Sequence, residues 1–361
     1  MGCLNSRSAV ERFKYDHTKY TSPLSKIEEC NNENENSCNI NILLLGAPRT
    51  GKSTIFRQMT QLHGNEFSEI ELETFAKLII QNTLDSMCNI LEFVASSDPP
   101  VIFEDPQVST DMTAVLEYKD KTFNVDIPQH LWDCVERLWA NELVQESFEN
   151  FDHKENYLLD SAAYLLNNVD RFRDPLFTPN EDDILRFYVR TTGFHDITFS
   201  TNEDHSEVNL IDCGSDHRRW VHCLKAVHKR EQIIVFCVAL SEYNLVLFRD
   251  IHTNRMHYSL KLFESVLNHA DQDALIVLFL NKMDLFEKKL KKFPLNVCFS
   301  DYQGRDNLKE ACQFIKDKFE VLGACGMKNQ EIHTHFTSAI DLKSRHALWD
   351  NIISCSKREV N

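Results

Sequence analysis

The sequence predicts an α/β fold in which a mostly parallel sheet is flanked by helices and interrupted by a long all-α segment. Short, almost continuous apolar runs occur at 40–45, 233–240 and 274–280, and each is too short for a typical buried helix. Such runs are typical of parallel strands that helices cover on both faces. Segments with helical periodicity alternate with these runs, which favours right-handed crossovers between parallel strands. The segment 64–183 reads as mostly helical.

The chain divides into three regions. Residues 1–38 are polar and end in the tract CNNENENSC, whose composition favours a flexible segment. Residues 64–183 form the expected helical domain, in which apolar residues recur at helical spacing, most clearly over 68–94. Residues 39–63 and 184–361 together form the expected sheet-bearing domain.

Composition limits the class of protein. The 361 residues, 42% of them apolar, are enough for one large or two medium domains. The formal net charge of −16 argues against nucleic acid as a partner. No apolar run approaches the roughly 18–20 residues of a membrane span, and the N-terminus lacks the charged-then-apolar block of a signal peptide. The 12 cysteines have no paired short spacings, so we expect buried thiols and no disulfide framework.

The first apolar run leads into GAPRTGKST, residues 46–54, which fits the pattern GxxxxGK[ST]. A strand before this motif and a helical pattern after it favour a phosphate-binding loop over an ordinary glycine turn. Backbone N–H groups would cradle the phosphates, Lys52 would reach the β- and γ-oxygens, and Ser53 would hold Mg²⁺. The candidate nucleotide-binding residues here are Gly46, Ala47, Pro48, Arg49, Thr50, Gly51, Lys52, Ser53 and Thr54.

A second motif, NKMD, follows the apolar run at 274–280 directly. The Asp284 carboxylate would accept two N–H bonds from a guanine edge and reject adenine, which lacks that donor pair. Lys282 would lay its methylene stem along the base. Asn281 belongs to the same motif, and Ala339 in FTSAI would bring its N–H to the guanine oxygen. Taken alone, NKMD also fits a polar turn between a strand and a helix.

A third group of residues has the chemistry of a magnesium site. Thr191 offers a hydroxyl in a loop where the helical segment ends, and Asp212 lies at a strand end. Hydroxyl and carboxylate oxygens suit Mg²⁺, so Ser53, Thr191 and, through water, Asp212 are the candidate metal ligands. Gly214 follows closely and is a candidate for backbone contact with phosphate. A surface loop with threonines is the alternative interpretation of Thr191.

In this order and spacing, the motifs make the chain resemble the α subunits of heterotrimeric G proteins from about residue 39 to 353. Shared segments include LLLGAPRTGKSTIFRQM, DILRFYVRTTGF, FLNKMDLFEKKL and IHTHFTSA. The resemblance implies a Ras-like P-loop GTPase domain with a mostly parallel six-stranded sheet. It also implies an inserted all-α domain and a site for GTP or GDP with Mg²⁺. It adds Leu185 and Arg186 to the nucleotide-binding residues.

The resemblance further implies a membrane-associated GTP/GDP switch that transduces receptor signals. Its partners would be a G-protein βγ dimer, a seven-helix membrane receptor and an effector. The start MGCLNS agrees, because it fits the pattern for myristoylation of Gly2, with Cys3 beside it for palmitoylation. Since two acyl chains anchor a protein where one binds only marginally, we expect the chain at the cytoplasmic face of the plasma membrane, on its inner leaflet.

Switch I and the phosphate loop depart from the family pattern. Tyr188 stands where the family has an arginine that stabilises charge on the transferring phosphoryl group, and tyrosine carries no positive charge. Arg186 and Arg190 flank this position, but neighbours along an extended loop point to other sides. Arg49 occupies the slot of the glutamate that pairs with the family arginine. It either restores positive charge near the phosphates or is a solvated loop arginine. Pro48 replaces a glycine and lacks an N–H.

Switch II departs further. From Asp212 to Trp220 the chain is three residues shorter than the family pattern D-x-G-G-Q and its following tryptophan. The simplest alignment deletes the second glycine, the catalytic glutamine near Gly214 and the arginine after it. Ser215 or Gly214 would still offer an N–H to a γ-phosphate, and Gln232 belongs to the approach of the next strand. We therefore assign no catalytic residue and predict slow or negligible hydrolysis.

The contacts to partners also diverge. Pro23 and the asparagine tract interrupt the N-terminal helix that lies against βγ in the family, and the tail 352–361 ends in polar residues. The switch III segment 248–254 replaces an acidic run with Arg249, Ile251 and His252. Three hypotheses follow. The first is a Gα that cycles with altered hydrolysis, and the second is a pseudo-GTPase that acts as a constitutive or scaffold-type signalling protein. The third, a P-loop ATPase or kinase, conflicts with NKMD and TSA.

Overall fold

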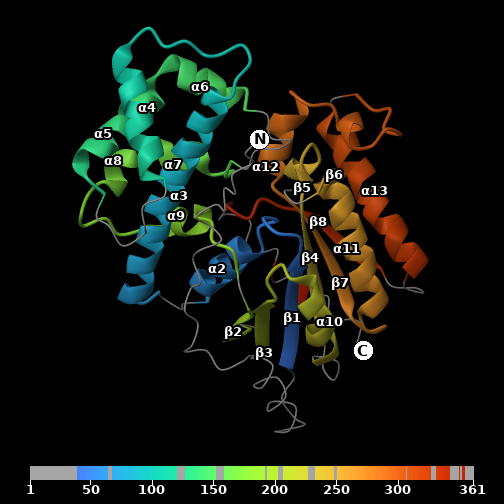
Figure 1. Ribbon diagram of the computed structural model, residues 1–361. Helices are drawn as coiled ribbons and strands as arrows, with labels where there is room; N and C mark the ends of the chain where they lie inside the picture. The colour runs from blue at the N-terminus through green and yellow to red at the C-terminus, as the bar shows by residue number, and fades with distance from the viewer. Residues whose placement is uncertain are drawn as a thin grey trace. The chain divides into compact units, whose positions relative to one another are not determined.

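The structure is a computed structural model, and the residues that it describes fall into two compact units (Figure 1). The helical unit lies within Glu66–Arg190, and the sheet unit lies within Tyr15–Asn65 and Thr191–Asn361. The described residues are 39–63, 67–119, 127–151, 158–191, 193–201, 206–226, 232–247, 250–305, 307–326 and 331–341, with Trp349, Ile352 and Ile353.

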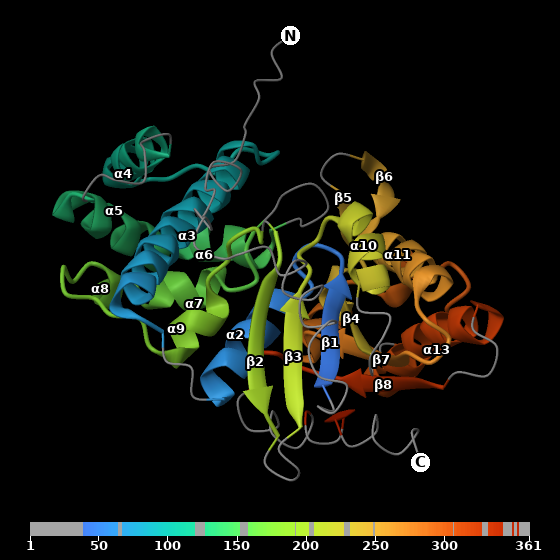
Figure 2. The ribbon, with the colours of Figure 1, turned by 90° about the horizontal axis from the view of Figure 1, so that it is seen from below.

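A six-stranded sheet in the order β2-β3-β1-β4-β7-β8 forms the centre of the sheet unit. Figure 2 shows β2, β3 and β1 side by side. Only the β2–β3 pair is antiparallel, so the expected mostly parallel sheet is confirmed, as are its three apolar strands. The strands are β1 Asn39–Gly46, β2 His195–Ser200, β3 Glu207–Asp212, β4 Gln232–Ala239, β7 Leu275–Asn281 and β8 Ile332–Phe336, with a separate hairpin of β5 Val246–Leu247 and β6 Asp250–Asn254.

Apolar side chains leave the two faces of the sheet for two separate cores. Along β1, Leu43 and Leu45 enter one core while Ile42 and Leu44 enter the other, because successive side chains of a strand point to opposite faces. Every residue of β4 and of β7 is buried. Burial on both faces explains why these strands read as unbroken apolar runs.

Helices cover both cores of the sheet unit. Ile55 and Met59 bring α2 (Lys52–Leu62) into the second core. The first core receives Trp220, Phe263, Phe286 and Phe319, one from each of four helices. These helices are α10 His217–Ala226, α11 Arg255–His269, α12 Met283–Leu290 and α13 Leu308–Gly326, and short 3₁₀ turns occur at η2 Leu240–Glu242 and η3 Leu295–Val297.

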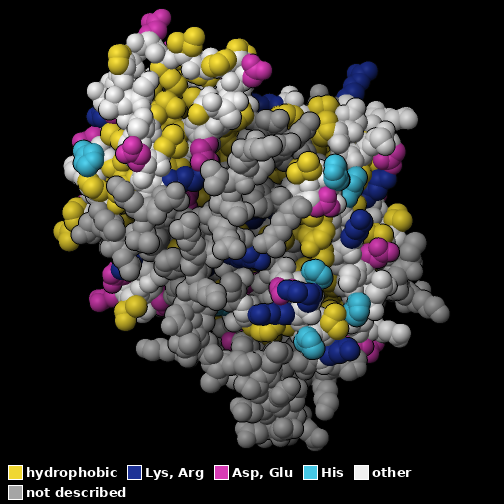
Figure 3. Space-filling view, in the orientation of Figure 1, with side chains coloured by type: hydrophobic (Ala, Val, Ile, Leu, Met, Phe, Trp, Pro, Cys, Tyr) yellow, Lys and Arg dark blue, Asp and Glu magenta, His cyan; other side chains and the backbone are white. Residues whose placement is uncertain are grey.

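The surface of α10 is basic although the whole chain is acidic. Figure 3 shows Lys, Arg and His side chains gathered over this helix. Its exposed positions are His217, Arg218, Arg219, His222 and Lys225. Asp216 pairs with Arg218 and Arg219 at 3.0 and 3.7 Å. The basic face therefore stands out against a net charge of −16.

The described part of the helical unit contains helices and no strand, as the periodicity predicts. A capping box of Ser68 and Glu71 begins the long helix α3. The pattern at 131–144 is divided, because Asn141 ends one helix and caps the next with its side chain. The helices are α3 Glu69–Ala95, α4 Pro106–Tyr118, α5 Gln129–Ala140, α6 Glu142–Glu149, α7 Ala162–Asn167, α8 Val169–Phe172 and α9 Glu181–Arg186.

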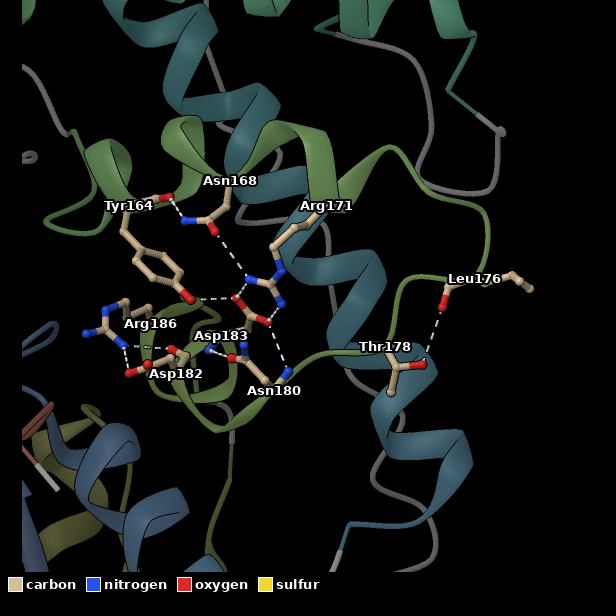
Figure 4. Close-up of polar contacts among 9 residues, drawn as sticks. All are labelled: Tyr164, Asn168, Arg171, Leu176, Thr178, Asn180, Asp182, Asp183 and Arg186. Atoms are coloured by element: carbon tan, nitrogen blue, oxygen red, sulfur yellow. Dashed lines mark hydrogen bonds and ion pairs between the residues drawn. The ribbon is translucent and has the colours of Figure 1, made fainter.

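A buried carboxylate organises the end of the helical unit (Figure 4). Asp183, fully buried in α9, accepts hydrogen bonds from both terminal nitrogens of Arg171, at 3.1 and 2.7 Å. It also accepts from the Tyr164 hydroxyl at 2.7 Å and from the Asn180 N–H at 2.9 Å. Burying this charge is tolerated because four donors surround it. The network fixes α9 to α7 and α8.

The chain leaves the helical unit between Arg190 and Thr191, later than the position 184 expected from the sequence. Ile184 and Phe187 lie in the core of the helical unit, where Phe187 packs on Phe75 with ring centroids 5.0 Å apart. These apolar contacts hold the segment after α9 on the helical unit.

Two further sequence expectations concern cysteines and membrane spans. Seven described cysteines are buried: Cys88, Cys134, Cys213, Cys223, Cys237, Cys298 and Cys312. Across the described residues, no helix combines the length and apolar character needed to cross a bilayer.

Asp85 in α3 is a buried carboxylate with incomplete hydrogen bonding, and it yields a prediction about stability. Its Oδ1 accepts from Gln81 at 2.8 Å, whereas its buried Oδ2 has no partner among the described residues. Burial raises the pKa of Asp85 to about 6, against the opposing effects of Gln81 and Lys119. The folded state therefore holds the proton more tightly than the unfolded chain, and stability is lost as pH rises from about 4 through 6.

Asp85→Asn should remove this loss. Above pH 6 we expect the variant to be more stable than the parent by about 1–3 kcal/mol, and near pH 4 the two should agree. Thermal unfolding of both proteins between pH 4 and 8 measures the difference. Glu117→Gln on the exposed face of α4 is the control and should change little at any pH. A stability difference that does not vary with pH would contradict the prediction.

Candidate functional site

The phosphate loop connects β1 to α2 at the carboxyl edge of the sheet. Gly46 and Gly51 have φ of 142° and 99°, values that favour glycine. A Cβ at Gly46 would lie 2.3 Å from the Cys237 carbonyl oxygen, and one at Gly51 would lie 2.3 Å from Asn281 Nδ2. Both glycines are thus required by backbone conformation and by close packing. The loop brings its N–H groups to the start of α2, where a helix attracts anions.

Lys52 lies buried beneath this loop. It is 5% exposed, and its Nζ donates to the carbonyl oxygens of Gly46 and Ala47, both at 2.8 Å. Burial lowers the pKa of Lys52, and the charge of Asp212 opposes that shift. Thr50 closes the loop by donating its hydroxyl to Ala47 O at 2.9 Å. A buried ammonium inside a loop of this shape fits a polyphosphate.

Asn281, the first residue of NKMD, joins the phosphate loop to the loop after β8. Its amide nitrogen donates to Thr50 O at 2.9 Å, and its Oδ1 accepts from Ala339 N at 3.0 Å and from Thr337 Oγ1 at 3.1 Å. The side chain is 1% exposed. Three segments predicted separately from the sequence are therefore joined at one buried amide.

The NKMD segment, expected to bind guanine, lies at the same carboxyl edge of the sheet, directly after β7. Asp284 in the first turn of α12 accepts from the Ser338 hydroxyl at 2.9 Å. Lys282 adopts a left-handed conformation, with φ 64°, at the start of that helix. The Met283 N–H donates to Thr337 O at 3.2 Å, which fixes the NKMD segment against the loop after β8. A carboxylate and a backbone N–H, Ala339, thus lie on adjoining loops.

The three residues expected to hold magnesium are brought together. Ser53 Oγ lies 2.6 Å from Thr191 Oγ1 and donates to Asp212 Oδ2 at 2.9 Å. The set contains only oxygen atoms, which suits Mg²⁺. Within the described part of the chain, no group of three or more His, Cys, Asp or Glu side chains forms another metal site. The fit supports Mg²⁺, and its binding stays a prediction.

Sequence reasoning missed two basic groups that face Asp212. Arg57 in α2 is 9% exposed, and burial lowers its pKa to about 10 while Asp212 raises it. Burial also lowers the pKa of His195, opposed by the charge of Asp212. Arg57 stands in a helix that otherwise looks amphipathic, so its only sequence signal is a charge on the buried face.

The shortened segment after Asp212 is fixed at Gly214. The Gly214 N–H donates to Asp212 Oδ1 at 2.9 Å, and Trp220 Nε1 donates to Gly214 O at 3.4 Å. A Cβ at Gly214 would lie 3.2 Å from Gly193 O and 3.4 Å from Thr191 O. Gln232 is the first residue of β4 and pairs with Asn41, at the end of the sheet opposite Gly46. It therefore cannot orient water at the candidate site.

The structure describes most of the remaining candidate residues, and three of them lie outside the described part of the chain. Thr54 lies in the first turn of α2, and Arg49 has a positive φ of 67°. Leu185, Arg186 and Tyr188 belong to the helical unit. There Leu185 is buried, Arg186 pairs with Asp182 and stacks on Tyr164, and the Tyr188 N–H donates to Asn82 Oδ1 at 2.5 Å. The lipidation positions Gly2 and Cys3, and Arg249, lie outside the described residues.

Removing the Asn281 side chain should destabilise the sheet unit. Asn281→Ala leaves Thr50 O and Ala339 N without their buried partner, and we expect a loss of about 2–4 kcal/mol of unfolding free energy. Denaturant unfolding measures it, with Gln272→Ala on the surface as the matched control. A loss below about 1 kcal/mol would show that Asn281 is not the junction described above.

A comparison with protein-family models is consistent with this geometry. The model described as G-protein alpha subunit matches residues 20–354, most of the chain and both compact units. The match includes the phosphate loop, the NKMD segment and the loop after β8. The chain belongs to the family of heterotrimeric G-protein α subunits.

Proposed function

We propose that this protein is a guanine nucleotide-binding α subunit that switches between GTP- and GDP-bound states, is associated with the membrane and hydrolyses GTP slowly. The observation that carries the proposal is the Asn281 junction, which holds the phosphate loop and the guanine-binding loops in one arrangement. Family membership supports nucleotide binding in general. The rate of GTP hydrolysis and the GTP/GDP cycle are proposed from the residues of this chain.

The phosphate loop would hold the nucleotide phosphates. N–H groups of residues 46–54 other than Pro48 would surround the anion, and Lys52 would turn its Nζ from the carbonyls of Gly46 and Ala47 toward phosphate oxygens. The site is suited to a negative ligand, because Lys52 and Arg57 are both buried near Asp212 and burial lowers the pKa of each.

Ser53 and Thr191 would bind the magnesium ion, and Asp212 would hold it through water. When bound, Mg²⁺ neutralises charge on the β- and γ-phosphates and orients them. Asp212 fixes Ser53 by hydrogen bonding and accepts from the Gly214 N–H, so one carboxylate aligns both the metal ligand and the shortened switch II.

Asp284 and Ala339 would select guanine. Two N–H groups of the base would donate to the carboxylate. The Ala339 N–H, which donates to Asn281 Oδ1 in the structure, would also face the guanine oxygen. Ser338 orients Asp284 from the neighbouring loop. Adenine lacks the pair of N–H donors that the Asp284 carboxylate would accept, which is the basis for discrimination at such a site.

Slow hydrolysis follows from the residues that this chain lacks. Tyr188 cannot supply the cation of the family arginine, which contributes roughly 10³–10⁵ to the rate in this class of reaction. No glutamine directly follows Gly214 in switch II. The next glutamine, Gln232, begins β4 at the end of the strand away from the phosphate loop. Starting from the roughly 10⁻² s⁻¹ of a Gα with its arginine in place, the loss of about 10³ leaves about 10⁻⁵ s⁻¹.

The same proposal covers the domains and the membrane. A helical domain, expected over residues 64–183 and reaching Arg190 in the structure, is inserted in a GTPase domain, and residues 1–38 are the lipid-anchored segment, acylated at Gly2 and Cys3. The helical character of the described residues supports the first part, and the MGCLNS motif supports the second. A βγ dimer and a seven-helix receptor are the proposed partners, with divergent contacts.

A pseudo-GTPase is the second candidate function. Its supporting observation is the loss of both catalytic positions, Tyr188 standing for arginine and a deletion for glutamine. Such a protein would bind nucleotide, or none, and act as a long-lived signal or a scaffold. Nucleotide content after purification and the hydrolysis rate separate it from a cycling switch.

Calorimetry with the intact chain tests nucleotide binding. With Mg²⁺ present we expect GDP and GTP to bind, and ATP not to compete. Asp284→Ala should weaken guanine nucleotides at least about 100-fold, because their donors lose a charged acceptor. Lys288→Ala, exposed on the same helix, is the control and should bind like the parent. Absence of heat for both GDP and GTP would refute the proposal.

Single-turnover hydrolysis tests the rate. We expect less than about 10⁻³ s⁻¹ for the parent protein. Tyr188→Arg restores the missing cation and should raise the rate at least about tenfold, whereas Tyr188→Phe should leave it unchanged. A parent rate above about 10⁻³ s⁻¹ would mean that another group of this chain replaces the family arginine.

A further inference from the structure

We propose that Arg255 is a positioning residue for phosphate binding: it holds the carbonyl of Pro48 and so directs the Arg49 N–H toward the bound phosphate. The inference rests on the nucleotide-binding function proposed above and concerns how this chain shapes its unusual loop. Neither Arg255 nor its partner Glu242 belongs to the sequence motifs.

The guanidinium of Arg255 is fixed by two different contacts. Its Nε pairs with Glu242 Oε2 at 3.0 Å, and a terminal nitrogen donates to Pro48 O at 2.9 Å. The side chains of Arg255 and Glu242 are 5% and 7% exposed. A planar guanidinium can serve a carboxylate and a carbonyl at once in fixed geometry, which an ammonium cannot.

The backbone of Arg255 is fixed as well. It is the first residue of α11, and its N–H donates to Leu245 O at 2.9 Å. Asn254 before it caps the helix by accepting from the Met256 and His257 N–H groups, at 2.8 and 3.3 Å, and donates to Tyr243 O at 2.5 Å. Glu242 ends the 3₁₀ turn that follows β4. The clamp on Pro48 is therefore built on the sheet and a capped helix.

The contact with Pro48 determines the direction of the next N–H. In a trans peptide the carbonyl and the N–H point in opposite directions. Holding Pro48 O on Arg255 thus turns the Arg49 N–H away from α11. Arg49 has φ 67°, a left-handed conformation that a non-glycine residue adopts only when its surroundings impose it. The Arg255 contact fixes the peptide plane that precedes this residue.

Proline at position 48 makes this clamp necessary. Pro48 has no N–H to offer a phosphate, so the following N–H groups carry more of the interaction. A loop free to rotate the Pro48–Arg49 peptide would present a carbonyl oxygen to the anion in place of an N–H. Arg255 excludes that orientation.

The competing interpretation is that Arg255 serves stability alone, as half of a buried ion pair. Two variants separate these roles. Arg255→Met alone leaves Glu242 charged and buried, which destabilises the fold whatever the clamp does. The double variant Glu242→Met, Arg255→Met removes both charges at similar volume, a change that buried pairs often tolerate.

The test combines unfolding, GDP binding and amide hydrogen exchange of peptides that contain Arg49 and Thr50. We expect the double variant to unfold close to the parent, to bind GDP at least tenfold more weakly, and to exchange these amides faster without nucleotide. Arg255→Lys keeps the charge opposite Glu242 and should also weaken GDP. Lys261→Met, exposed on α11, should match the parent in all three measurements.

Each outcome decides the question. A double variant that binds GDP and exchanges like the parent overturns the inference. If the double variant does not fold, Arg255→Lys decides: parent-like GDP affinity and exchange overturn the inference, and weaker binding with faster exchange supports it. If the parent binds no guanine nucleotide, the proposed function fails, while the exchange of the Arg49 amide still shows whether Arg255 holds the loop.

Discussion

The buried amide of Asn281 is the interaction on which the site depends. It connects segments that lie more than 200 residues apart in the chain, since Thr50 follows β1 and Asn281 ends β7. Sheet register brings them close: β1 pairs with β4, and β4 with β7, so that Gly46, Cys237 and Leu280 stand near one edge. The amide then converts neighbouring strand ends into one rigid set of loops. Backbone groups that would otherwise be buried without partners are satisfied there.

The carboxyl edge of the sheet holds buried basic side chains, although the chain as a whole is acidic. The chain carries a net charge of −16, yet Lys52 and Arg57 are both buried near the carboxylate of Asp212. Burial lowers the pKa of both basic groups, which means that their charged forms are held at a cost in this site. A polyphosphate with its metal ion is the kind of ligand that relieves such a cost. Arg255 differs, because Glu242 already balances it.

The sequence predicts the buried strands and the binding motifs, and it misses the residues that position them. Continuous apolar runs predict β1, β4 and β7 because burial on both faces leaves a strong local signal. GAPRTGKST and NKMD predict site residues because close backbone approach and base selection require particular residue types. Arg255 and Glu242 carry no such signal, since each acts through a neighbour that only the fold supplies. The Asp183 network and the late exit at Arg190 likewise depend on packing between distant helices.

The shortened link between β3 and α10 limits how switch II can respond to a ligand. β3 ends at Asp212 and α10 begins at His217, with Gly214 held to Asp212 at one side and to Trp220 at the other. The five steps from Asp212 to His217 span at most about 18 Å when fully extended, and the folded link has both ends fixed. There is little slack for α10 to slide along the sheet. Any movement of α10 would therefore have to break a hydrogen bond of Gly214 or pivot the helix about this residue, and pivoting would tilt the basic face with it.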